Sequence, residues 1–144
     1  MLPRLCLILT VLGFVGCLEA PSPVLPVDPI PAGAVLPPGM PNDRWFFENV
    51  VQSEVPVLVD FTATWCRPCQ EMKPALHEIE KAYGNRLKVI EVDIDDHPGI
   101  ADHFRVSSVP RLMVIKNGAI EAEAPGKRTY YEIINVLKSS VGRP

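Results

Sequence analysis

Two cysteines separated by two residues, Cys66-Arg67-Pro68-Cys69, are the part of this sequence best suited to chemistry. They lie between the apolar run 55–62 and a segment with helical periodicity, so Cys66 is predicted at a helix N-terminus. Unpaired backbone N–H groups and the helix dipole stabilise a thiolate there, and the thiolate is the nucleophile of disulfide exchange. The spacing lets the second thiol reach the first and resolve a mixed disulfide. The pattern therefore indicates thiol–disulfide chemistry.

Three other uses of the cysteine pair stay open at this point. A structural disulfide would close a very small loop, which removes little entropy from the unfolded chain. A zinc site needs about four ligands, and His77, His97 and His103 stand at no recognised ligand spacing. Handling of Cu(I) by the thiols is a further alternative, because soft thiolate ligands select that ion. We expect no metal site and no organic cofactor, because the Cys66–Cys69 dithiol is itself a redox centre.

Asp60 is unusual because it interrupts the apolar run VLVDF, six residues before Cys66. A carboxylate buried in a strand is costly unless it is neutral or has a specific partner. At this end of the strand it could take or return the proton of Cys69, directly or through a water molecule. The alternative is an aspartate at the strand edge that faces solvent.

The segments that must position these residues alternate between helix and strand. We predict, in chain order, a helix capped by Asn42 or Asp43, a strand at 55–62, a helix at 66–83, a strand at 90–95, a short helix at 98–104, strands at 112–116 and 119–124, and a helix opened by Thr129. Asn117-Gly118 predicts a hairpin, and Thr129 with Glu132 forms a capping box. This order implies an α/β fold with a mixed central β-sheet flanked by α-helices in three layers.

Together these motifs resemble the thioredoxin family from about Asp43 to Val141. VDFTATWCRPC is similar to the family's active-site strand and turn, and VDID, SVP, KNG and Gly126 follow in the family's order. The resemblance implies a thioredoxin fold in which Cys66 attacks a protein disulfide, Cys69 resolves the mixed disulfide and Asp60 carries the proton. It also implies a substrate groove formed by Trp65, Arg67, Pro68, Val109, Pro110 and Gly126. The Val109–Pro110 peptide would be cis in that family, whereas the sequence alone favours trans.

The sequence departs from the family pattern at three places. Arg67 replaces the usual glycine of C-G-P-C; its charge either favours the thiolate and an oxidising protein, or is hydrated and has little effect. Glu91 stands where many thioredoxins have a lysine, and a negative neighbour could raise the pKa of Asp60. The family's first strand has no clear equivalent before Asn42. Because Pro68 resembles the reducing members we favour a reductase; an oxidase or isomerase and a non-catalytic binding module are the alternatives.

The first 17 residues have the features of a signal peptide. Arg4 and the amino terminus precede the apolar run Leu5–Val15, and FVGC at residues 14–17 resembles the bacterial lipobox, in which Cys17 would receive lipid. Cleavage after Ala20 and an uncleaved anchor are the alternatives. We predict a Pro-rich linker at residues 18–41 and a thioredoxin domain at residues 42–144. All three interpretations place this domain in the cell envelope, on the periplasmic or extracellular side.

Length and charge limit the remaining choices. A chain of 144 residues is enough for one ordinary domain. It has 14 Lys and Arg against 17 Asp and Glu, a net charge of −3, so we expect no nucleic acid partner. The expected partners are protein thiols and disulfides, an unidentified membrane electron donor or acceptor, and the membrane itself through the lipid anchor. We expect a monomer.

Overall fold

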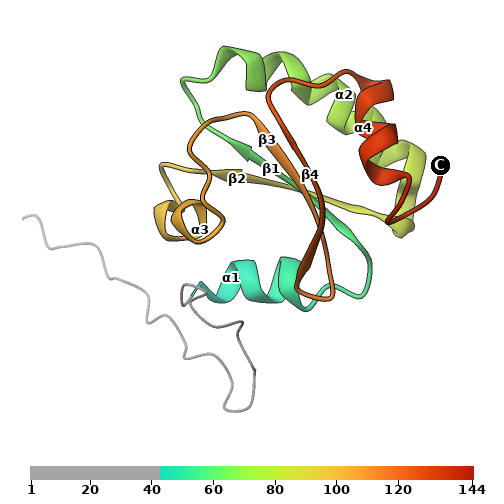
Figure 1. Cartoon of the computed structure of the whole chain (residues 1–144), viewed down its shortest axis with the longest axis horizontal. Coiled ribbons are helices and arrows are strands. Elements are labelled where there is room, and N and C mark those ends of the chain that lie inside the picture. Colours follow the sequence, from blue (N-terminus) through green and yellow to red (C-terminus); the bar gives the residue numbers. More distant parts are fainter. Residues whose placement is uncertain (1–42) are drawn as a thin grey trace, which may run out of the picture.

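A four-stranded mixed sheet forms the centre of the computed structural model, which describes residues 43–144 (Figure 1). Its strands are β1 (Val57–Thr62), β2 (Lys88–Asp93), β3 (Arg111–Lys116) and β4 (Ala119–Pro125). They are ordered β2-β1-β3-β4; β1 is parallel to β2 and antiparallel to β3, and β4 is antiparallel to β3. The predicted signal peptide, Cys17 and the Pro-rich linker lie outside the described residues.

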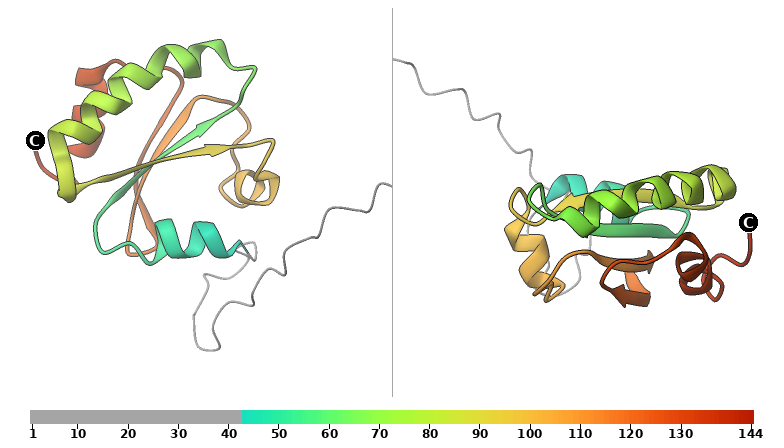
Figure 2. Two further views of the ribbon diagram at one scale, coloured as in Figure 1. Left: turned by 180° about the vertical axis from the view of Figure 1, so that it is seen from behind. Right: turned by 90° about the horizontal axis from the view of Figure 1, so that it is seen from above.

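Helices cover both faces of this sheet. They are α1 (Arg44–Phe46), which continues as a π-helix over Phe47–Val51, α2 (Arg67–Tyr83), which ends in a short 3-10 turn, α3 (Pro98–His103) and α4 (Tyr130–Leu137). Helices α2 and α4 lie on one side of the sheet and α1 and α3 on the other (Figures 1 and 2). This arrangement confirms the predicted fold class, a mixed sheet flanked by helices in three layers.

Strand β1 separates two hydrophobic cores because alternate side chains of a strand point to opposite faces. Leu58 packs with residues of α2 and α4, such as Leu76 and Leu137. Val59 and Phe61 face the other way, into the cluster that contains Phe46 of α1. Since every residue of β1 is buried, the strand has no solvent-facing side. This explains its near-continuous apolar sequence and makes a charged residue within it conspicuous.

The element boundaries differ from the predicted ones where pairing decides them. Strand β2 was expected at 90–95 but runs from Lys88 to Asp93, because it pairs with β1 from Val57↔Lys88 to Thr62↔Asp93. The capping box of α4 is confirmed, since the Thr129 and Glu132 side chains each accept a hydrogen bond from the other residue's backbone N–H.

Within residues 43–144 no strand precedes Val57, so the sheet there has four strands. No helix in this same range is both long enough and apolar enough to cross a membrane.

Candidate active site

Cys66 is the N-cap residue of α2, as predicted, and is joined to Cys69 by a disulfide bond. Its extended backbone ends the β1–α2 loop, and its Sγ accepts a hydrogen bond of 3.2 Å from the backbone N–H of Cys69. Pro68 occupies the first turn of the helix, where a missing N–H costs nothing. Cys66 is 4% exposed and Cys69 is fully buried. The cysteine nearer to solvent is therefore the one whose sulfur faces the helix N-terminus.

Apolar side chains from three loops surround the disulfide. Ala63 packs with both cysteines, and Ile94 and Val109 lie against this small cluster. The Val109–Pro110 peptide is cis, and the Pro110 carbonyl accepts a hydrogen bond of 2.8 Å from the N–H of Gly126. The fold thus brings Val109, Pro110 and Gly126 to the cysteine pair, although they lie 40 or more residues away in the sequence. Ile94 was not among the predicted site residues.

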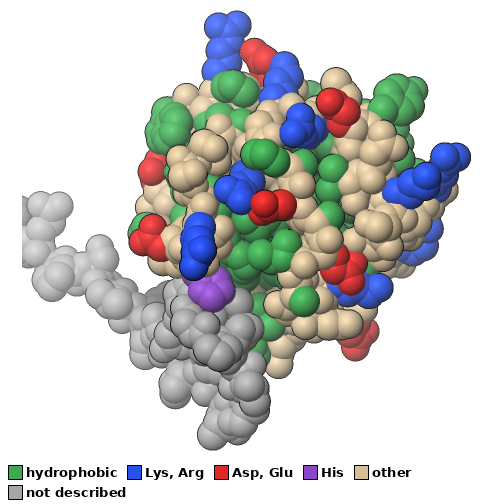
Figure 3. Space-filling model, in the orientation of Figure 1, with side chains coloured by type: hydrophobic (Ala, Val, Ile, Leu, Met, Phe, Trp, Pro, Cys, Tyr) green, Lys and Arg blue, Asp and Glu red, His purple; other side chains and the backbone are tan. Residues whose placement is uncertain are grey.

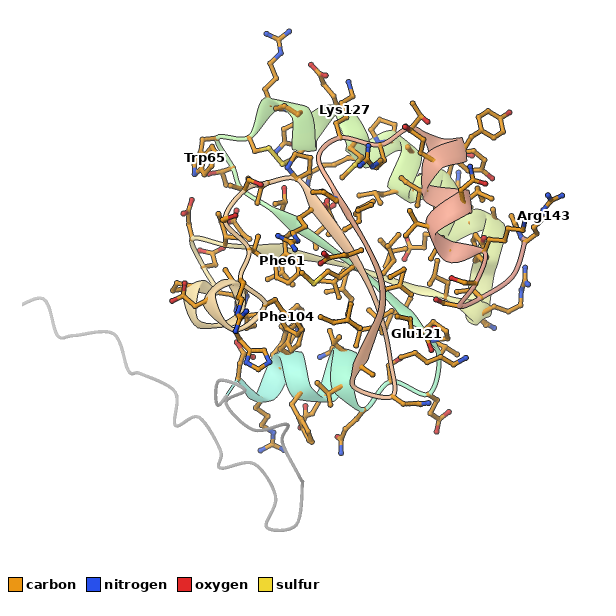
Figure 4. All side chains as sticks on the ribbon, viewed as in Figure 1. Phe61, Trp65, Phe104, Glu121, Lys127 and Arg143 are labelled. Atoms are coloured by element: carbon orange, nitrogen blue, oxygen red, sulfur yellow. A yellow bond between two sulfur atoms is a disulfide. The ribbon has the colours of Figure 1, made fainter. Side chains whose placement is uncertain are left out.

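Trp65 and Arg67 are the exposed side chains beside the disulfide. Trp65 is 68% exposed and its Nε1–H donates a 2.8 Å hydrogen bond to Asp95. Arg67, also solvent-exposed, pairs with Glu71 one turn along α2, and Lys127 reaches the same carboxylate. Figure 4 shows Trp65 and Lys127 at the end of the molecule where α2 begins. The hydrogen bonds from Lys127 and Arg67 to the Glu71 carboxylate lower its pKa, and Lys127 has the larger effect. Glu71 therefore stays ionised, and its negative charge offsets the positive charge of Arg67 beside Cys66.

The Asp60 side chain is completely buried, which rules out the alternative of a solvent-facing aspartate. Neither carboxyl oxygen has a hydrogen-bond partner. The pKa of Asp60 is raised from 3.8 to about 7: burial is the largest cause, the negative charge of Glu91 adds to it, and the positive charge of Lys73 partly offsets the rise. Such a carboxyl group can both accept and return a proton near neutral pH.

Lys73 and Glu91 form an ion pair beside Asp60. Glu91 is the residue of β2 that pairs with Asp60 in the register of the sheet, and Lys73 belongs to α2. The sequence analysis identified Glu91 but missed Lys73. Lys73 lies four residues after Cys69, about one helical turn, and this spacing would have placed it over the same region of the sheet.

The three histidines do not gather near the cysteines. His97 stacks on Trp45 and its Nδ1 lies 3.1 Å from a carboxylate oxygen of Asp43, whereas His77 is exposed on α2. Residues 43–144 contain no group of three or more His, Cys, Asp or Glu that could hold a metal ion.

Comparisons with known proteins agree with this geometry. The family model for thioredoxin matches residues 40–139, which is more than half of the chain. The chain belongs to the thioredoxin family. It is 42% identical over 100 residues to "Thioredoxin" of Rickettsia bellii, an alignment that covers 69% of this chain and 95% of that protein. It is 33% identical over 100 residues to "Thioredoxin" of Haemophilus influenzae (69% and 94%), and 41% identical over 77 residues to "Thioredoxin 1" of Synechococcus elongatus (54% and 72%).

Family membership and the cysteine pair together make this thioredoxin-family protein a thiol–disulfide oxidoreductase. Thioredoxins act on protein disulfides through their own dithiol and use no separate cofactor. The reduced Cys66–Cys69 dithiol carries the two electrons of the reaction and gives them up when the disulfide forms.

The buried carboxyl group should make stability depend on pH. Between pH 3.8 and about 7 the folded protein holds a proton on Asp60 that the unfolded chain has released, so the free energy of unfolding falls as pH rises through this window. Asp60→Asn removes the ionisable group and with it this loss of stability at higher pH. We expect the oxidised variant to exceed the parent by on the order of 3 kcal/mol at about pH 8, and the gap to close near about pH 3.

Urea unfolding of the oxidised protein over this pH series measures the gap. Glu121→Gln is the matched control, because Glu121 is an exposed carboxylate on β4 (Figure 4). A gap of the same size at every pH would contradict the assignment of Asp60 as the titrating group.

Proposed function

We propose that this thioredoxin-family protein is a protein-disulfide reductase of the cell envelope. The observation that carries the proposal is the position of the Cys66–Cys69 pair. It lies at the N-terminus of α2, beside the exposed Trp65, with Asp60 buried on the β1 face that α2 covers. This arrangement supplies a nucleophile, a resolving thiol and a proton carrier in one place.

The reaction balances as one exchange of two electrons. The Cys66 thiolate attacks one sulfur of the substrate disulfide, forming a mixed disulfide and releasing the other substrate sulfur as a thiolate, which takes a proton from solvent. Asp60 then accepts the proton of the Cys69 thiol. The resulting thiolate attacks the Cys66 sulfur, closing the Cys66–Cys69 disulfide and releasing the second substrate thiolate. A dithiol reductant at the membrane must return two electrons and two protons.

The surroundings of Arg67 support reduction over oxidation. An uncompensated cation beside Cys66 would stabilise the thiolate and make the protein more oxidising. Here the Arg67 side chain is 90% exposed and its Nε lies 3.2 Å from the Glu71 carboxylate. Water and this ionised neighbour weaken its field at Cys66. The substitution of arginine for glycine therefore should not turn the domain into an oxidant.

The surface beside the disulfide suits an extended segment of another protein. The backbone before cis-Pro110 and the turn at Gly126 lie together, with Trp65 at the margin. Figure 3 shows that side chains of both charge signs are spread over the face drawn in Figure 1, with hydrophobic surface between them. We infer that substrate recognition combines backbone contacts near Val109 with apolar contacts around Trp65.

The envelope location rests on the sequence before residue 42. The apolar run 5–15 and the FVGC motif support export and lipid attachment at Cys17, and the Pro-rich residues 18–41 would hold the domain away from the membrane. A reductase in this location needs a membrane electron donor.

Substitution of each cysteine tests the order of the steps. Cys69→Ser should trap the mixed disulfide between Cys66 and a substrate protein, because the resolving thiol is lost, whereas Cys66→Ser should trap nothing. Both variants should lose disulfide-reducing turnover by at least roughly 100-fold. Non-reducing electrophoresis with mass spectrometry identifies the trapped bond. A substrate bound to Cys69 in Cys66→Ser would reverse the two roles, and capture that persists in the double variant would indicate a binding module.

The reduction potential tests the direction of electron flow. Equilibration of residues 42–144 with dithiothreitol or glutathione buffers should give about −270 mV, the value typical of reducing thioredoxins. Arg67→Gly should shift the reduction potential by less than about 30 mV, a shift that corresponds to a tenfold change in the equilibrium constant. A parent value of about −180 to −120 mV would instead indicate an oxidant or isomerase.

Lipid attachment is tested on the full chain in a bacterial host. We expect radiolabelled fatty acid to be incorporated and the protein to sediment with membranes, and Cys17→Ser to lose both properties. Cys6→Ser is the matched control, because Cys6 lies within the apolar run and outside the lipobox. An unlabelled protein cleaved after Ala20 and released in soluble form would contradict the proposed anchor.

A further inference from the structure

Two polar side chains lie buried side by side on the same face of β1. Asp60 and Thr62 are two positions apart in the strand, and alternate residues of a strand share a face. Asp60 is fully buried and Thr62 is 5% exposed. Neither the two Asp60 carboxyl oxygens nor the Thr62 hydroxyl has a hydrogen-bond partner among the described residues. Buried polar groups of this kind are ordinarily satisfied by bound water.

A surface pocket has Thr62 in its wall, together with residues of β2 and α2. Its volume is about 240 Å³, and its wall includes Thr62, Gln70, Lys73, Glu91 and Asp93. One water molecule takes up about 30 Å³ in the liquid, so the pocket has room for several. The wall is rich in groups that donate or accept hydrogen bonds.

The charges around Asp60 lie along the same route. Glu91 of β2 and Lys73 of α2 are the charged groups that act on Asp60, and its neighbour on β3 is the apolar Leu112. Lys73 and Glu91, which both act on Asp60, form a partly exposed ion pair in the wall of the pocket. Elsewhere β1 is covered by the apolar side chains of the two hydrophobic cores.

We propose that this pocket is the route by which protons pass between solvent and Asp60, and that the Thr62 hydroxyl positions the water molecule that bridges them. The proposal rests on the proposed function, in which Asp60 takes the proton of Cys69 and must later release it. In one cycle the proton moves from the Cys69 thiol to the Asp60 carboxylate, then through the bridging water to bulk water. Thr62 is a positioning residue, because it touches neither sulfur nor substrate in this scheme.

Thr62→Val tests the role of the hydroxyl while nearly preserving the shape of the side chain. A water molecule held by Thr62 would donate to the ionised Asp60 carboxylate and stabilise it. Its loss should therefore raise the pKa of Asp60 above about 7 and slow disulfide exchange near neutral pH. We expect a roughly five- to tenfold slower rate, part of the 10²–10⁴-fold that positioned proton transfer contributes.

Two measurements on the same proteins separate the causes. Carbon-13 NMR of the Asp60 carboxyl group gives its pKa without any substrate, and stopped-flow exchange with a peptide disulfide gives the rate as a function of pH. Thr62→Ser keeps the hydroxyl and should restore both values. Thr64→Val is the matched control, because Thr64 also lines the pocket but is exposed, and it should leave both values unchanged.

The outcomes distinguish this proposal from the proposed function. An unchanged pKa of Asp60 in Thr62→Val, or an unchanged rate despite a raised pKa, would overturn the role of Thr62. If the parent protein exchanges no disulfides, the proposed function fails, and the NMR titration alone then decides whether Thr62 connects Asp60 to water. Should Thr62→Val not fold, Thr62→Ala gives the same comparison against Thr62→Ser.

Discussion

The burial of β1 on both faces is the constraint on which the rest of the structure depends. Its apolar side chains hold α2 and α4 on one face and α1 and α3 on the other. Because the strand is fixed this firmly, the loop that follows it delivers Cys66 to one defined position, the N-cap of α2. The same burial removes Asp60 from water and so gives the carboxyl group its proton affinity. Stability and chemistry thus have a common origin in one strand.

The active site itself is assembled from loops that meet at one end of the sheet. Ala63 and Cys66 come from the loop after β1, Ile94 from the loop after β2 and Val109 from the segment before β3. The cysteine pair therefore lies in apolar surroundings, while Trp65 and Arg67 remain exposed. An exposed margin around a nearly buried disulfide fits the proposed binding of substrates with an extended backbone.

The sequence predicted those features that depend on local pattern. Strand β1, the helix after Cys66, the hairpin at Asn117-Gly118 and the capping box at Thr129 all appear where expected. Features that depend on pairing between distant segments were less predictable. Strand β2 begins and ends two residues earlier than predicted, and its observed register places Glu91 beside Asp60. Lys73 lies near these two residues only because α2 packs on the sheet. Thr62 was overlooked because a threonine in a strand is ordinary; its unsatisfied hydroxyl is visible only in three dimensions.

The environment of Asp60 shows why a buried, weakly compensated carboxyl group suits this chemistry. Full pairing with a cation would hold the pKa low and leave a carboxylate too weakly basic to take a thiol proton. Complete isolation would keep the group protonated and equally unable to accept one. Lys73 and Glu91 act on Asp60 with opposite signs and bind each other, so desolvation remains the largest cause of its raised pKa. A value of about 7 lies between these extremes, as the proposed exchange of a proton with Cys69 requires.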